Sequence, residues 1–265
     1  MNNKKFHRIS FLLTLFLVVM VLSSGCAPNF DELIEKRDAE KLVDIMMNSS
    51  ETRYSGIAQK ALVQLGGEAA DPLLRYLGNE RLLKEARLGK KQVIKVLDEI
   101  YENARENIQQ AAINQVINGD GIQGAEKYDP STDGPHPFIF VMENEWEHAE
   151  KFGYWRVFTP DPPSAEWRAY YPEQLQVVIR VLDYPEYMSL DGCSYLGGKY
   201  KGRYRSMTEY ELFEATTGEK VGTFSIYADP GECPGMTSDF SPMYGHTFTS
   251  EVNNKLKDYG LEFGE

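Results

Sequence analysis

The stretch YRSMTEYELFEATTGEKVGTFSIYA, residues 204–228, indicates a β-hairpin and decides how the second half of the chain is interpreted. Tyr204–Glu214 and Lys220–Ala228 are rich in aromatic and β-branched residues, which is typical of strands. The turn between them contains Gly218, which tolerates the positive φ that hairpin turns need. The period of two predicts apolar side chains on one face of each strand: Tyr210 and Leu212 on the first, Phe224 and Ile226 on the second.

Further strands and one helix are expected around this hairpin. Phe138–Val141, Trp155–Phe158 and Leu175–Leu182 have the same strand-like composition, and Thr247–Tyr259 has helical periodicity that ends at Gly260. Residues 138–265 therefore predict an α+β domain with an antiparallel sheet.

The pattern of residues 26–117, in the first half of the chain, is helical. Apolar residues recur at helical spacing from Phe30 to Ile117, with Ser49-Ser50 expected to cap one helix and Gly66-Gly67 to end it. The phrase IAQKALVQLG at 57–66, followed by AADPLLRYL at 69–77, resembles a HEAT-like repeat, and a generic helical bundle is the alternative. The resemblance implies a short helical stack over residues 26–117 that presents a binding surface.

The segment 118–137 separates the two halves. Seven of its twenty residues are glycine or proline, which disfavours regular structure. We expect it to be a linker, so the fold class is α+β: a HEAT-like all-α domain followed by an α+β domain.

The N-terminus carries a secretion signal. Lys4, Lys5 and Arg8 precede an apolar run, and Leu22-Ser23-Ser24-Gly25-Cys26 ends it. This ending resembles the lipobox of prokaryotic lipoproteins, which implies removal of residues 1–25, a lipid on the Cys26 thiol and attachment to a membrane outside the cytoplasm. Since Ala27 follows the cysteine, the expected location is the cell surface or, in a Gram-negative host, the outer membrane. The alternative is an ordinary secretory signal with a coincidental cysteine.

Residues 175–263 also resemble a domain of uncharacterised extracytoplasmic bacterial proteins. The resemblance rests on Cys193-Ser194-Tyr195, the hairpin turn and the loop DPGECP at 229–234. It implies a disulfide between Cys193 and Cys233 and brings no activity with it. Once Cys26 is assigned to lipid, these two cysteines are also the remaining even pair in an oxidising compartment; a redox or nucleophilic thiol is the alternative.

The charge of the chain excludes some partners. The formal net charge is −12, and removing three cationic residues with the signal moves it to −15. So acidic a chain is a poor ligand for nucleic acid and is repelled by anionic lipid headgroups. Membrane attachment is therefore expected through the acyl chains alone.

Catalytic and metal-binding motifs are not evident. There is no GxSxG, P-loop or dinucleotide fingerprint in the mature chain, and His136, His148 and His246 lack zinc-ligand spacing. Asp129-x-Ser131-x-Asp133-Gly134 begins like a calcium loop but has Phe140 where a glutamate is required, so a solvated turn is expected. We expect no catalytic residue, cofactor or metal.

Aromatic residues are concentrated between Trp146 and Tyr187 among several prolines. Rigid amphipathic rings on such loops are typical of surfaces that recognise peptides or glycans, and core packing is the alternative. The sequence therefore predicts a binding or scaffold module for a protein or glycan of the envelope, and the alternative is an envelope hydrolase that uses Asp or Glu. The candidate contact residues are Trp146, Tyr154, Trp155, Trp167, Tyr170 and Tyr171.

Overall fold

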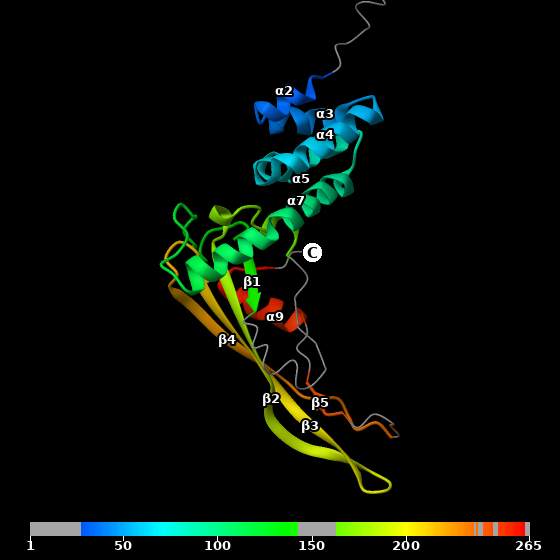
Figure 1. The fold of residues 1–265 in the computed structure, drawn as a ribbon, viewed down its shortest axis with the longest axis vertical. Coiled ribbons are helices and arrows are strands. Elements are labelled where there is room, and N and C mark those ends of the chain that lie inside the picture. The colour runs from blue at the N-terminus through cyan, green and yellow to red at the C-terminus, as the bar shows by residue number, and fades with distance from the viewer. Residues whose placement is uncertain (1–27, 143–162, 236, 238–240, 246–248, 263–265) are drawn as a thin grey trace, which may run out of the picture.

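The computed structural model describes residues 28–142, 163–235, 237, 241–245 and 249–262. Helices form one end of the molecule, and a long twisted hairpin forms the other (Figure 1). The α+β fold class is therefore confirmed. Within the described residues, none of the helices has both the length and the apolar composition for a membrane crossing.

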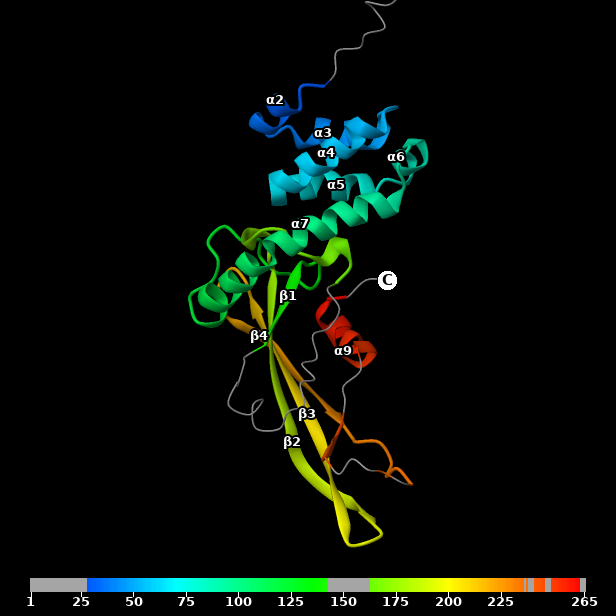
Figure 2. The same ribbon diagram turned by 45° about the vertical axis from the view of Figure 1, so that its right-hand side comes forward.

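Short helices stack at the N-terminal end (Figures 1 and 2). Asn29 and Asp38 cap the first two through their side chains, as these residue types commonly do. The expected cap at Ser49-Ser50 is wrong, because Glu51 is the N-cap of the next helix and Ser49 Oγ instead accepts from its backbone N–H. The helical elements are α2 (Phe30–Glu35), α3 (Ala39–Asn48), α4 (Thr52–Leu65), η1 (Gly66–Ala69), α5 (Ala70–Leu77), α6 (Glu80–Glu85), α7 (Lys90–Ala111) and its π-helical continuation η2 (Ala112–Ile117).

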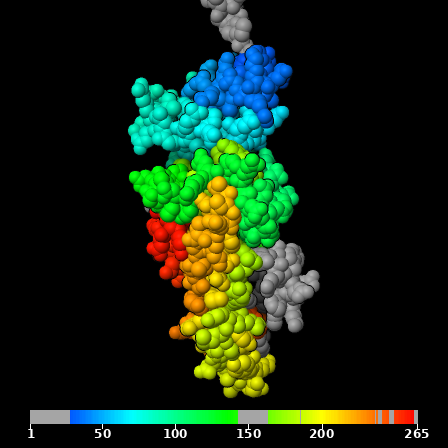
Figure 3. Space-filling model, turned by 90° about the vertical axis from the view of Figure 1, so that its left-hand side faces the viewer, coloured from blue at the N-terminus to red at the C-terminus, as the bar shows by residue number. Residues whose placement is uncertain are grey.

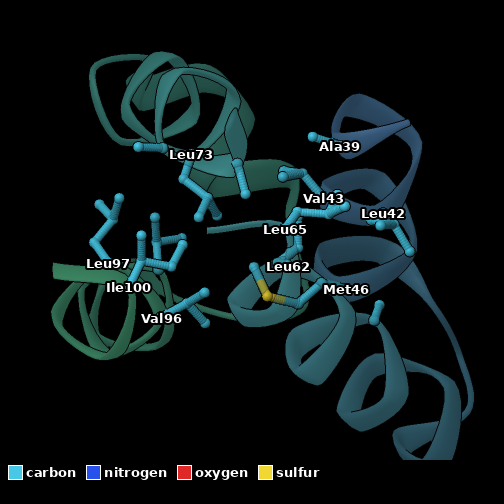
Figure 4. Close-up of a cluster of buried hydrophobic side chains, with 14 of the residues drawn as sticks. Ala39, Leu42, Val43, Met46, Leu62, Leu65, Leu73, Val96, Leu97 and Ile100 are labelled. Atoms are coloured by element: carbon cyan, nitrogen blue, oxygen red, sulfur yellow. The ribbon is translucent and has the colours of Figure 1, made fainter. Parts of the chain in front are cut away.

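The stack has one apolar core. Side chains from α3, α4, α5 and the first half of α7 point toward one another in its centre (Figure 4). Complete burial of such side chains stabilises by roughly 1.5–3 kcal/mol each, so the core holds these short helices in place. Whether the stack is HEAT-like stays a prediction. The labelled members of this core are Ala39, Leu42, Val43, Met46, Leu62, Leu65, Leu73, Val96, Leu97 and Ile100.

The sheet of the described residues has five strands. The two strands of the hairpin are β3 and β4, and Gly218 in the turn has φ +70°, as predicted. The expected antiparallel sheet is corrected to a mixed one, since β1 pairs in parallel with β2 and β5 in parallel with β3. The strands are β1 (Phe138–Met142), β2 (Val177–Tyr195), β3 (Lys199–Glu214), β4 (Lys220–Ala228) and β5 (Met243–Tyr244); the remaining elements are η3 (Ala165–Trp167), η4 (Pro172–Gln174), α9 (Thr249–Leu256) and η5 (Lys257–Tyr259).

Each face of the sheet is covered near the helical end. On one face, Tyr210, Leu212 and Ile226 pack with α9. On the other, Val178 and Leu175 pack with the end of α7 and with η2. Beyond these covering helices, β2 and β3 continue away from the helical stack as a second hairpin, which we call the long hairpin (Figure 2).

Helix α7 joins the two halves. Its first half belongs to the core of the helical stack through Val96 and Ile100, and its last part, from Ile108, packs on the sheet. With 22 residues it is about 33 Å long. Because one continuous helix contributes to both cores, the two halves are held in a fixed relative position.

The segment 118–137 packs against the sheet, so the expectation of a linker does not describe it. It lacks regular structure, as its composition predicts, but Ile122, Tyr128 and His136 are buried. The backbone N–H of Ile122 donates to the carbonyl of Ala215 at 2.7 Å, next to the hairpin turn. This long-range contact is what makes the segment part of the fold.

Tyr128 gives the fold a measurable pH dependence. Its ring packs edge-on against His136, its hydroxyl donates to the backbone carbonyl of Tyr259, and burial raises its pKa to about 12. A phenol in the unfolded chain has a pKa of about 10. The folded state therefore keeps this proton at higher pH than the unfolded state. Its contribution is complete below about pH 10 and is lost as the pH rises toward 12.

We expect Tyr128→Phe to lower the free energy of unfolding by about 1 kcal/mol at neutral pH, since one hydrogen bond is lost. It should also make the decline of stability above pH 10 shallower, without abolishing it, because burial raises the pKa of Tyr244 to about 12 as well. Chemical denaturation at a series of alkaline pH values measures both effects. Tyr200→Phe, at an exposed position, is the control; an equal slope in the two variants would contradict this account.

Candidate binding surface on the long hairpin

Three of the sequence-predicted contact residues lie at the junction of the helical stack and the sheet. Tyr170 is 1% exposed, and its hydroxyl donates to the carbonyl of Ala165 at 3.0 Å. Trp167 and Tyr171 are partly buried against the core clusters on either side of the junction. Core packing is therefore what the structure shows for Tyr170, whereas a contact role for the partly buried Trp167 and Tyr171 stays a prediction.

Polar contacts hold the segment that carries these rings against α7 and α5. Arg168, between them in sequence, pairs with Asp98 of α7 at 2.6 Å and lies over the ring of Tyr101. Gln174 donates to Asp71 of α5 at 3.0 Å. The segment therefore fastens the sheet to the helical stack.

The remaining aromatic candidates, Trp146, Tyr154 and Trp155, lie outside the described residues, as does the proposed lipidation site Cys26.

Cys193 and Cys233 form a disulfide, as expected, with 5.6 Å between their Cα atoms. It ties the loop after β4 to the far end of β2, and the guanidinium of Arg203 donates to the carbonyl of Pro230 at 3.3 Å in the same loop. The disulfide braces the projecting part of the long hairpin formed by β2 and β3.

One face of the sheet carries exposed rings where β2, β3 and β4 lie side by side. Tyr184, Met207 and Tyr227 lie directly opposite one another on β2, β3 and β4, so their side chains share a face. This is the face that α7 and η2 cover nearer the helical end. A bulge between Tyr184 and Met188 adds Tyr187 and Met188 to the row. We call Tyr184, Tyr187, Met188, Met207 and Tyr227 the tyrosine patch.

The patch is both accessible and ordered. Tyr184, Tyr187, Met188 and Tyr227 are between 41% and 53% exposed. The ring centroids of Tyr187 and Tyr227 lie 5.3 Å apart, and the neighbouring Tyr187 raises the pKa of Tyr227. Two rings fixed against each other lose little side-chain entropy when a ligand binds.

A bidentate ion pair borders the patch. Arg205, opposite Met188, donates to both carboxylate oxygens of Asp229, at 2.6 and 3.0 Å. This pairing lowers the pKa of Asp229, so both groups are charged at neutral pH. The patch therefore offers apolar ring surface, phenolic hydroxyls and a fixed charged pair beside one another.

No protein-family model, curated protein or solved structure matches this chain. The interpretation of the patch therefore depends on its own chemistry.

Three carboxyl groups of the described residues have shifted pKa values. A general acid of a glycosidase needs a raised pKa, whereas the shifted pKa values of Glu32, Asp129 and Asp229 are all lowered. Asp129 accepts from the backbone and hydroxyl of Ser131, which is the solvated turn that the sequence predicts. The described residues contain no group of three side chains placed to hold a metal ion.

The sequence does contain a signal for the tyrosine patch, but it lies in the periodicity of the strands and not in the density of aromatic residues. Tyr184 and Tyr187 belong to the aromatic stretch, but nothing local distinguishes them from Tyr170. Strand periodicity is more informative. Phe224 and Ile226 face the core, so Tyr227, one residue further along, has to face the other way.

Proposed function

We propose that this protein is a lipid-anchored, non-catalytic binding module of the cell envelope, and that the tyrosine patch contacts its protein or glycan partner. The observation that carries the proposal is the half-exposed, mutually packed pair Tyr187 and Tyr227 on a sheet face. Tyrosine is enriched at binding hot spots because its ring gives contact area and its hydroxyl a polar partner.

The architecture suits such a role. The patch lies on β2, β3 and β4. The tip of the long hairpin formed by β2 and β3 is at the opposite end of the molecule from the first helices (Figure 3). A lipid on Cys26 would attach next to those helices, since α2 begins at Phe30. The patch, on the sheet, would then be separated from the membrane by the helical stack. The disulfide also fits an extracytoplasmic protein, because such bonds persist in oxidising compartments.

Binding is favoured over hydrolysis by the form of the surface. Active sites are concave and exclude water, whereas the patch lies on the face of a sheet. The lowered pKa values of the shifted carboxyl groups also suit ion pairs better than acid catalysis.

The test is a pull-down from detergent-solubilised envelopes of the source organism, with the acylated chain, its Cys26→Ala variant and an acylated Tyr187→Ala/Tyr227→Ala variant. We expect Cys26→Ala to lose the part of its membrane attachment that resists high salt but to recover the same partner, whereas the double variant keeps that attachment and loses the partner. Recovery of the partner by the double variant, or of none by any form, would refute the proposal.

A further inference from the structure

The corner where α6 meets α7 is basic, although the protein as a whole is acidic. Residues 80–91 contain five cationic and two acidic side chains, a formal charge of five minus two, or +3, in a chain of −12. Figure 2 shows α6 at the edge of the helical stack beside the beginning of α7. All five cationic residues are exposed: Arg81, Lys84, Arg87, Lys90 and Lys91, which we call the basic corner.

The backbone of the corner is fixed in place. The carboxamide oxygen of Asn79 accepts from the backbone N–H of Arg81 and of Leu82, which caps α6. The backbone N–H of Arg87 donates to the carbonyl of Met47 at 3.0 Å, which attaches the connection to α3. The charges are therefore presented by an ordered segment.

Two further features suit an anionic, amphipathic surface. Gly89, the N-cap of α7, has no side chain to satisfy the first N–H groups, so the positive end of the helix dipole adds to the basic charge. Leu82 is 37% exposed on α6, a helix with no buried residue. An apolar side chain among cationic ones is the combination that binds at the lipid headgroup boundary.

Neighbouring acids leave the corner positive. Glu80 and Glu85 pair with Lys84 and Arg81 and are already counted in the +3. On α3, which lines the same hollow as Leu82, Glu40 is paired with Arg75, and Asp44 reduces the local charge by one.

Acids further away act weakly. Asp98 lies seven residues beyond Lys91 on α7, about 10 Å along the axis. At physiological salt the Debye length is about 8 Å, so charges at that distance are largely screened. The net charge of the whole chain therefore does not decide what this corner binds.

We propose that the basic corner docks on a bilayer containing anionic phospholipid, the membrane that carries the protein's own anchor. The choice of a lipid surface rests on the charge complementarity, on Leu82 and on the proposed lipidation. Cys26 precedes α2 by four residues, a reach of about 14 Å, so the helical stack would lie beside that membrane. Attachment through acyl chains alone, expected from the net charge, would then be incomplete.

The test is co-sedimentation with vesicles of phosphatidylcholine alone or with phosphatidylglycerol added. It uses the chain beginning at Ala27, which has no lipid but keeps all three apolar cores. We expect salt-sensitive binding to the anionic vesicles only. Lys84→Glu/Lys90→Glu/Lys91→Glu should weaken it by about 100-fold or more, since each cationic residue near the surface contributes about fivefold.

The matched control is Lys36→Glu/Lys41→Glu/Lys60→Glu, which makes the same charge change at three exposed residues: the C-cap of α2, one residue of α3 and one of α4. Equal losses in the two triple variants, or equal binding to both vesicles, would overturn the proposal. So would binding to soluble polyphosphate without binding to vesicles. Tyr187→Ala/Tyr227→Ala should leave vesicle binding unchanged, which separates this result from a failure of the proposed function.

Discussion

Replacing both Tyr187 and Tyr227 by alanine is expected to weaken binding to the envelope partner by about 30-fold or more. Truncation of a hot-spot residue costs about 2 kcal/mol or more, and 1.4 kcal/mol corresponds to about tenfold in affinity. These two rings contact each other, so removing both eliminates the fixed surface and not only part of it. Co-sedimentation of the chain beginning at Ala27 with lipid-extracted envelope fragments measures the effect without interference from membrane binding.

The control is Val221→Ala, on the same strand as Tyr227 and 41% exposed. Six residues of strand separate the two positions by about 20 Å. We expect the control to bind as the unmodified chain does. A double variant Tyr187→Phe/Tyr227→Phe, which keeps the rings, should retain most of the affinity if ring contact dominates. Equal affinity for the alanine variant and the unmodified chain would show that the tyrosine patch is not the binding surface.

Tyr170→Ala is expected to lower the free energy of unfolding by about 3–5 kcal/mol. Its ring is enclosed at the junction, with Tyr101 edge-on at 6.3 Å between centroids. Removal of a large buried aromatic side chain leaves a cavity that its neighbours fill only in part. Because α7 contributes to both halves, the variant should still unfold in one transition. Chemical denaturation followed by circular dichroism measures the size and the number of transitions.

Tyr170→Phe separates packing from hydrogen bonding at this position. It keeps the ring and removes only the bond to the carbonyl of Ala165, so we expect a loss of about 1 kcal/mol. A loss below about 1 kcal/mol for Tyr170→Ala, or independent unfolding of the two halves, would show that the junction is not a shared core.

The hairpin of β3 and β4 was predictable because the residues that specify it are close together in the sequence. Alternating apolar residues and Gly218 lie within 25 consecutive positions, and no distant contact is needed to specify them. β4 has the predicted bounds, and α9 with η5 lies within the predicted C-terminal helix. The parallel pairing of β1 was not predictable, since β1 and β2 are joined by a long connection whose path depends on the whole fold.

Aromatic density did not distinguish the surface from the core. Tyr170 and Tyr187 both lie in a proline-rich stretch, and only packing against α7 separates the buried one from the exposed one. Net charge was similarly uninformative about the basic corner, since an average over the chain conceals a local excess of Lys and Arg. For Tyr170 the deciding contacts join residues that are far apart in sequence, whereas the basic corner is visible in a short window of the sequence.

The most direct test of the account is photo-crosslinking in intact cells, with a benzophenone amino acid at position 184 and, separately, at position 221. Both positions are equally exposed, but only Tyr184 belongs to the tyrosine patch. We expect a discrete adduct of higher mass from position 184 and none from position 221. Adducts of equal yield from both positions, or an adduct from position 221 alone, would contradict the assignment of the patch as the binding surface.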